Sequence, residues 1–249
     1  MYRERAARPA GAVVWTRTAA GGAERVLPDG CTDLIWRERG GAGELIIAGP
    51  DTAAQVSESP AGVRYTGLRF APGTGPAVFG IPACELRDLR VPLDAVWPAA
   101  DVRRLTGLLT GSDRPGRVLE AAALARLRDA PPADPAIAAV VAELTGGSPV
   151  GAVADRVGLS VRQLHRRSLA AFGYGPKTLA RVLRLNRALD AAREGRPFAD
   201  VAADHGYADQ AHLAREVRAL TGVPLGELTG ARRASPGGGP GGAPGPDAG

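Results

Sequence analysis

The chain has 249 residues, enough for two modest domains, and its 45% hydrophobic and 23% charged content excludes an intrinsically disordered protein. The N-terminus has no apolar segment typical of a secretory signal, and no run approaches the roughly 18 apolar residues of a membrane span. We therefore expect a cytoplasmic protein in which Cys31 and Cys84, the only cysteines, are unpaired and mostly buried.

Residues 1–98 are predicted to form a small mainly-β domain. Short runs with β-branched or aromatic content are separated by turn signals that contain Gly and Pro. These runs are residues 13–15, 34–36, 45–47 and 65–70.

Residues 99–133 are predicted to be a short helical linker. Val102, Leu105 and Leu108 recur at helical spacing, and Pro131 and Pro132 cannot continue a helix. We expect an all-α domain over residues 134–230 and a disordered tail of Gly, Pro and Ala over residues 231–249. The fold class is therefore predicted to be α+β.

The charge is spread unevenly along the chain. Residues 1–149 hold 17 Arg and 17 acidic residues, whereas residues 150–233 hold 14 basic and 8 acidic residues. A neutral N-terminal half and a basic C-terminal half indicate a polyanionic partner for the second half, although a solvated arginine-rich surface would have the same composition.

An internal repeat lies in the basic half. Residues 153–158 have the sequence VADRVG and residues 201–206 have VAADHG. Each copy describes a short helix that ends at a glycine in the left-handed conformation. Ser160 and Asp209 can then cap a second helix, whose Leu164 or Leu213 points inward. This is the layout of a helix-turn-helix unit, in which the second helix enters the major groove of DNA.

A long helix is predicted between the two copies. Pro176 suits its first turn, and an apolar stripe of leucines and Val182 continues to about Glu194. Successive major grooves lie roughly 34 Å apart on one face of DNA. A single chain could therefore contact two of them.

Over residues 134–229 the sequence resembles the AraC/XylS family of transcription regulators. The order and spacing of seven motifs carry the resemblance. These are Gly158-Leu159-Ser160, Leu164-His165-Arg166, the run FGYGP at 172–176, RLNRA at 184–188, Gly206-Tyr207-Ala208-Asp209, Leu213-Ala214-Arg215 and LTGVP at 220–224.

The resemblance implies a sequence-specific DNA-binding transcription regulator whose N-terminal domain senses an effector or dimerises. Double-stranded DNA is the implied partner. The resemblance leaves open a contact with RNA polymerase, an unidentified small-molecule effector, and the choice between monomer and homodimer. The family usually has Phe where Ser168 and Val217 stand here, so we expect looser packing in the second unit.

The side chains expected to contact DNA come from the two second helices and their surroundings. Arg bonds guanine bidentately and Gln bonds adenine, whereas contacts to phosphates give affinity without sequence choice. From the resemblance and from exposed positions on the helices, the expected base contacts are Arg162, Gln163, His165, Arg166, Gln210, Ala211, His212 and Arg215. The expected phosphate contacts are Ser160, Arg167, Lys177, Arg181 and Arg218. Arg215 has a competing interpretation, an ion pair with Asp209 or Glu216.

The N-terminal region contains one conspicuous run, RVLPDGCTDLIW at residues 25–36. Its physical interpretation is a turn at Pro28-Asp29-Gly30 that leads into a buried strand. Asp29 and Asp33 beside Cys31 are either polar groups of a pocket, or Asp29 caps the turn and Asp33 pairs with an arginine. We favour the second alternative.

Two other functions compete with the regulator. A DNA-repair alkyl acceptor fused to the same module would need a reactive thiol beside a base or cation, and Cys84 is followed by Glu85 with no adjacent His. A pure interaction module that has lost DNA binding is the third hypothesis. We expect a regulator that is not an enzyme and has neither metal nor cofactor.

Overall fold

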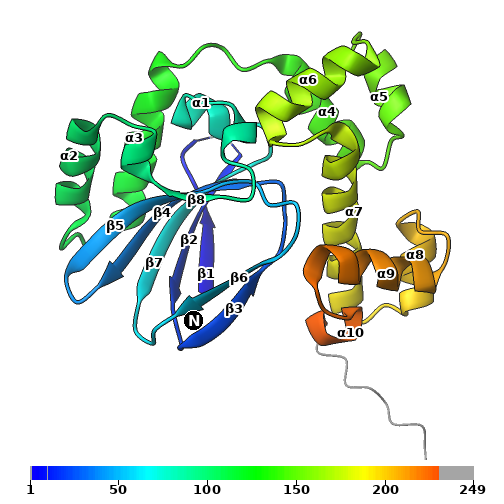
Figure 1. Ribbon diagram of the computed structural model, residues 1–249, viewed down its shortest axis with the longest axis horizontal. Helices are drawn as coiled ribbons and strands as arrows, with labels where there is room; N and C mark the ends of the chain where they lie inside the picture. Colours follow the sequence, from blue (N-terminus) through cyan, green and yellow to red (C-terminus); the bar gives the residue numbers. More distant parts are fainter. Residues whose placement is uncertain (1, 10, 230–249) are drawn as a thin grey trace, which may run out of the picture.

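Figure 1 shows the computed structural model, which describes residues 2–9 and 11–229. One part of the molecule is a β-sheet with helices on one side, and the other part is made of the helices α4 to α10. The fold is α+β, with the strands before the helices of the C-terminal part, as the sequence predicted. The tail expected over residues 231–249 lies outside the described residues.

The N-terminal part contains a six-stranded antiparallel sheet with the order β1-β2-β7-β4-β5-β8. These strands are β1 (Tyr2–Ala6), β2 (Ala12–Thr18), β4 (Thr32–Arg39), β5 (Ala42–Ala48), β7 (Arg64–Phe70) and β8 (Arg90–Pro92). A second sheet pairs β3 (Gly22–Val26) with β6 (Gln55–Ser59). The four predicted runs lie in β2, β4, β5 and β7. The sequence did not predict β3 because all five of its residues are exposed, so it lacks a buried alternation.

The large sheet has two different faces, because successive side chains of a strand point to opposite sides. On β4, Leu34 and Trp36 belong to the main hydrophobic core. Asp33 and Ile35 alternate with them along the strand and line a cavity on the other face, beneath the β3–β6 sheet.

Helices α2 (Ala99–Leu109) and α3 (Pro115–Asp129) cover the core face of the sheet, together with α1 (Gly75–Phe79) and 3-10 turns at Ala83–Glu85 and Leu93–Ala95 (Figure 1). Leu105 and Leu119 belong to the same core as the strands. We therefore propose that residues 99–133, which the sequence suggested as a linker, are part of the N-terminal unit.

The C-terminal part consists of α4 (Pro135–Thr145), α5 (Val150–Arg156), α6 (Val161–Phe172), α7 (Pro176–Arg193), α8 (Phe198–Asp204), α9 (Gln210–Thr221) and α10 (Leu225–Leu228). Figure 1 shows α4, α5 and α6 at one end of α7 and α8, α9 and α10 at the other, and each group has its own hydrophobic core. Leu179 belongs to the first core, and Leu185 and Leu189 belong to the second. No helix among residues 2–9 and 11–229 could span a membrane.

The second helical core is closed despite its smaller side chains. Leu213 and Val217 are both 0% exposed. In the first unit Ser168 is equally buried, and its hydroxyl has no hydrogen-bond partner within the described residues. The looser packing expected of the second unit is therefore not visible as solvent exposure.

A close approach at Gly67 generates a stability prediction. Gly67 lies opposite Trp15 in the sheet, and a Cβ at residue 67 would stand 2.1 Å from Trp15 Cε2. We expect Gly67→Ala to lower the free energy of unfolding by about 1–3 kcal/mol, the typical effect of overpacking. Urea denaturation of the full chain measures it.

The matched control is Gly107→Ala on α2. Gly107 is exposed, and a Cβ there would meet no atom within 4 Å. Alanine should stabilise this helix by about 0.5–1 kcal/mol. Equal effects of the two substitutions would contradict the packing of Trp15 described above.

Candidate nucleic-acid interface and the cavity beside it

The first helix-turn-helix unit is formed by α5, a tight turn and α6. Gly158 follows α5 with φ +66°, a left-handed conformation that glycine adopts at little cost. Gln163 N donates to Ser160 Oγ at 3.2 Å, and Ser160 N donates to Gln163 Oε1 at 2.9 Å. This capping box confirms the cap predicted at Ser160, and it occupies the side-chain oxygen of Gln163.

The outer face of α6 carries Arg162, His165 and Arg166, opposite the buried Leu164. Arg162 and Arg166 have no ion-pair partner among the described residues, so both guanidinium groups are open to a ligand. His165 packs against the backbone at the start of α7, since a Cβ at Gly175 would lie 2.8 Å from His165 Cε1.

The second unit repeats this arrangement with α8 and α9. Gly206 has φ +72°, and Asp209 caps α9 by accepting from His212 N at 2.6 Å. Gln210, Ala211 and Arg215 are exposed. His212 is half-buried, and its Nδ1 accepts from Ala208 N at 3.2 Å. The imidazole therefore helps to hold the turn and has only Nε2 left for a base.

The residues expected to contact phosphates fall into two groups. Lys177 and Arg218 are exposed and have no ion-pair partner within the described part of the chain. Arg167 instead pairs with Asp134 at 2.9 Å, and Arg181 forms two hydrogen bonds to Glu216 at 3.0 and 3.1 Å. Glu216 of α9 therefore pairs with arginines of α7, Arg181 and Arg184.

Arg215 has no ion pair with Asp209 or Glu216. Asp209 caps α9, and Glu216 binds Arg181 and Arg184. The competing structural interpretation of Arg215 is therefore wrong, and its guanidinium stays exposed.

Both second helices touch the N-terminal part with their C-terminal ends. Arg87 Nη1 donates to Gly173 O after α6 at 3.4 Å, and Arg25 Nη1 donates to Thr221 O at the end of α9 at 2.8 Å. Ala54 N also donates to Leu220 O at 2.7 Å. Cationic donors are favourable at a helix C-terminus, where the last carbonyls lack partners. The first turns of α6 and α9 lie at the other ends, away from these contacts.

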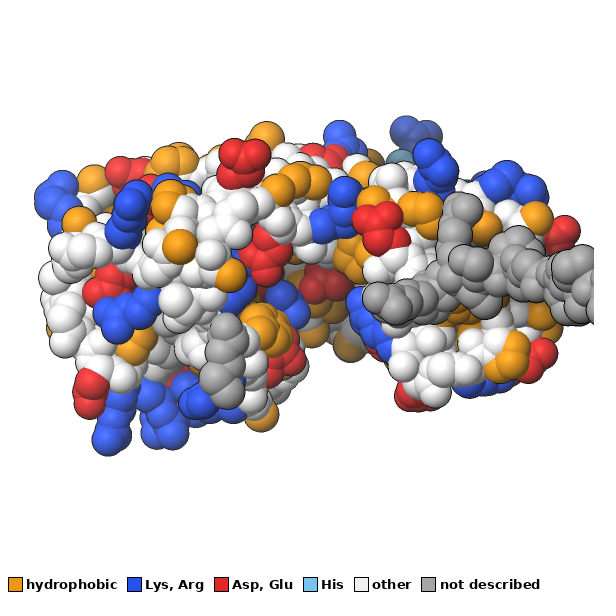
Figure 2. Space-filling model, turned by 90° about the horizontal axis from the view of Figure 1, so that it is seen from below, with side chains coloured by type: hydrophobic (Ala, Val, Ile, Leu, Met, Phe, Trp, Pro, Cys, Tyr) orange, Lys and Arg blue, Asp and Glu red, His pale blue; other side chains and the backbone are white. Residues whose placement is uncertain are grey.

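Lys and Arg side chains gather along one edge of the C-terminal part (Figure 2). The same view shows a recess between the two parts, lined by both acidic and basic side chains. The hydrogen bonds from Arg87 and Arg25 to the C-terminal ends of α6 and α9 were not predicted. No local sequence signal at either arginine identifies a partner so far along the chain.

A cavity of about 330 Å³ lies between the large sheet and the β3–β6 sheet. Its apolar lining includes Trp15, Ile35 and Ile46 from the large sheet and Val26 and Val56 from the small one. Volumes of about 300–1,000 Å³ are typical of small-molecule sites.

Arg69 lies on the polar side of the cavity. Its guanidinium contacts Glu4, Asp29 and Asp33, each at 3.4 Å. Trp15 Nε1 donates to Asp33 Oδ1 at 2.5 Å. Nearby, Arg90 forms two hydrogen bonds to Asp51 at 2.6 and 2.9 Å.

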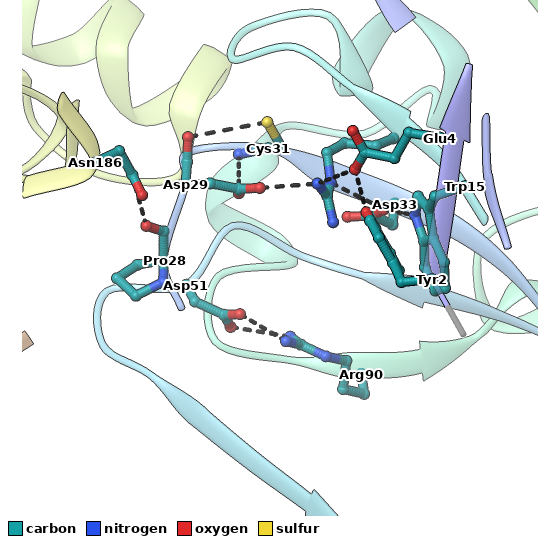
Figure 3. A network of polar contacts seen from close by, with 11 residues as sticks. Tyr2, Glu4, Trp15, Pro28, Asp29, Cys31, Asp33, Asp51, Arg90 and Asn186 are labelled. Carbon is teal, nitrogen blue, oxygen red and sulfur yellow. Dashed lines mark hydrogen bonds and ion pairs between the residues drawn. The ribbon is translucent and has the colours of Figure 1, made fainter. Parts of the chain in front are cut away.

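The turn at Pro28-Asp29-Gly30 connects this cavity to α7. Asp29 Oδ1 accepts from Cys31 N at 2.9 Å, and Asp33 contacts Arg69, as the favoured alternative predicted. The same two carboxylates line the cavity, so the pocket alternative holds as well. On the other side of the turn, Asn186 Nδ2 of α7 donates to Pro28 O at 2.9 Å (Figure 3).

Two segments of the chain match known family models. Residues 153–231 match a model described as a helix-turn-helix domain. The match places a helix-turn-helix domain over the two units that the sequence predicted. The N-terminal part of the chain matches, over residues 12–92, a model described as a domain of unknown function, DUF6597. No curated protein sequence matches the chain.

Solved structures of ToxT from Vibrio cholerae are similar to the chain at low identity. ToxT from Vibrio cholerae O395 is 9% identical with a TM-score of 0.45, covering 90% of this chain and 99% of that chain. Wild-type ToxT from strain SCE256, solved with a bound unsaturated fatty acid, is 10% identical with a TM-score of 0.43, covering 90% of this chain and 96% of that chain.

The two cysteines of the chain lie in different surroundings. Both are free thiols; Cys84 is exposed, so the expectation of two mostly buried thiols is wrong for it. Burial, reinforced by Asp29 and Asp33, raises the pKa of the Cys31 thiol. A reactive thiol requires the opposite shift. No cluster of metal-binding side chains occurs among the residues that the structure describes.

Asp33 generates a prediction about pH and stability. Burial raises the pKa of its carboxyl from 3.8 to about 6, although Arg69 partly offsets this effect. The folded protein thus binds this proton more tightly than the unfolded chain, and the resulting stabilisation is lost as the pH rises through about 6. Asp33→Asn should therefore raise the Tm at pH 7.5, with a gain of at most about 3 kcal/mol at about 1.4 kcal/mol per pKa unit.

Thermal unfolding of both proteins between pH 4 and pH 8 measures this effect. The difference in Tm should shrink toward pH 4, where Asp33 is protonated. Asp94→Asn, at an exposed position without an ion pair in the described ranges, is the control and should change stability by less than about 0.5 kcal/mol. A difference that is constant with pH would show that Asp33 is not the titrating group.

Proposed function

We propose that the regulator recognises its operator with the first turns of α6 and α9 in two successive major grooves. The observation that carries this proposal is the pair of capped helices whose exposed arginines, Arg162, Arg166 and Arg215, lie in the half of each helix away from the N-terminal part. Both helices pack on α7, whose 18 residues span about 27 Å at 1.5 Å per residue. That length suits grooves about 34 Å apart, since each unit also extends beyond an end of α7.

The contacts to bases come mainly from exposed groups that no internal bond occupies. Arg162, His165 and Arg166 supply them from α6, and Gln210, Ala211 and Arg215 supply them from α9. Gln163 and His212 contribute only the amide nitrogen and Nε2, because their other polar atoms hold the helix starts.

Contacts to phosphates are assigned to Lys177 and Arg218. Arg167 and Arg181 keep their carboxylate partners and act on DNA only through their remaining N–H groups. Ser160 caps α6, which leaves its hydroxyl hydrogen as a donor for a phosphate.

The cavity of the N-terminal part is proposed as the site of a small-molecule effector. It has the volume and the mixture of apolar and polar lining that ligand sites have, and the turn at residues 28–30 links it to α7. A single chain offers both recognition helices, so we propose that a monomer suffices for operator binding. The regulator would act in the cytoplasm, where it could also contact RNA polymerase.

Arg166→Ala tests the recognition of bases. An operator is first selected from random duplexes with the wild-type protein, and affinity is then measured by fluorescence anisotropy on that duplex and on a scrambled one. Arg166→Ala should weaken binding to the selected duplex by about 1–3 kcal/mol and binding to the scrambled duplex much less.

Arg218→Ala is the matched comparison for a phosphate contact. It should weaken binding to both duplexes alike and reduce the salt dependence by the contribution of about one phosphate. Arg104→Ala, at an exposed position of α2, should change the affinity for neither duplex. Equal losses on the two duplexes with Arg166→Ala would refute base recognition by α6.

A further inference from the structure

The apolar wall of the cavity is incompletely covered by the protein itself. Val26 and Val56, which line it from the β3–β6 sheet, are 42% and 56% exposed. Ile35 and Ile46 line it from the large sheet and are only partly buried. An apolar body between these two walls would remove all four side chains from water, which is favourable.

The arginines of the cavity are already neutralised. Arg17 pairs with Glu24, Arg37 with Glu44, and Arg90 with Asp51. An anionic ligand would therefore meet guanidinium groups whose positive charge a carboxylate of the protein already compensates. These pairs disfavour a carboxylate or phosphate as the polar group of the ligand.

The carboxylates, in contrast, are incompletely bonded. Glu4, Asp29 and Asp33 share the single guanidinium group of Arg69 at 3.4 Å each, whereas charged hydrogen bonds are normally about 2.7–2.9 Å long. Asp33 has 14% of its side chain exposed, and no hydrogen bond to its Oδ2 occurs in the described part of the chain. This oxygen is therefore open to a donor that enters the cavity.

Aromatic rings stand beside these carboxylates. The rings of Tyr2 and Trp15 stack with their centroids 6.2 Å apart, and both residues line the cavity. Tyr65 lines it too and already carries the Arg17 guanidinium at 4.6 Å from its ring centroid. Aromatic faces of this kind attract cations.

We infer that the cavity binds an amphipathic amine, whose protonated nitrogen donates to Asp33 and Asp29 while its apolar body lies between Ile35, Ile46 and the valines of the β3–β6 sheet. This inference rests on the proposed role of the cavity as the effector site, and it specifies the chemical class of the effector.

Three probes with the same apolar body and different polar groups test the inference. These are 4-phenylbutylamine, 4-phenylbutan-1-ol and 4-phenylbutyrate, titrated calorimetrically into the full chain at pH 7.5. We expect the amine to bind at least tenfold more tightly than the alcohol and the carboxylate. Equal or tighter binding of the alcohol or the carboxylate, or no binding of the amine, would overturn the inference.

Asp33→Asn locates the site. It keeps an oxygen for Trp15 but removes the charge, so it should weaken amine binding at least tenfold and leave binding of the alcohol unchanged. Unaltered amine binding would place the amine elsewhere. Ile46→Ala is a second variant, which should weaken all bound probes alike because it shortens the apolar wall.

Failure of this inference can be separated from failure of the proposed function. DNA binding by the unliganded wild-type protein is measured in the same preparation on the selected and scrambled duplexes. Selective DNA binding without amine binding would reject only the amine. Amine binding without selective DNA binding would reject only the proposed recognition of two grooves.

Discussion

The shared helix α7 is the constraint on which the DNA-binding part depends. One side chain near its start, Leu179, is buried in the core of the first unit, and Leu185 and Leu189 are buried in the core of the second. Because a helix is stiff over this length, the two cores cannot move independently without bending it. The ion pairs from Arg181 and Arg184 to Glu216 add a second connection between α7 and α9.

The large sheet connects stability with ligand binding in the N-terminal part. Its core face is filled by leucines and Trp36, whereas its other face holds a carboxylate that is expensive to bury. A fold selected for stability alone would place an apolar residue at position 33. The carboxylate at this position is therefore consistent with a site that binds the hydrogen-bond donor of a ligand. Functional groups of this kind commonly lower the stability of a protein.

The helical part of the fold was predictable because its signals are local. The glycines at 158 and 206 and the caps at Ser160 and Asp209 each depend only on the next few residues, and the structure places all four as expected. The strands β1, β3, β6 and β8 were missed because they are short or mainly polar and exposed on one side or both.

The candidate sites were predictable only in part, because their partners are far apart in sequence. The exposed arginines of α6 follow from helical periodicity. That Glu216 would bind Arg181, or that Glu4 would join Asp29 and Asp33 around Arg69, follows only from the folded chain. The structure likewise shows that Gln163 and His212 each use one polar atom internally.

The contacts at the ends of α6 and α9 have a consequence for the target sequence. Both helices contact the N-terminal part, through Arg87 and Arg25, and both pack on α7, so their separation is a property of the protein and not of the DNA. Inserting one base pair between the two half-sites would shift the second one by about 3.4 Å and rotate it by roughly a tenth of a turn. Operators of this regulator should therefore share one invariant distance between their two conserved blocks, however much the bases between those blocks vary.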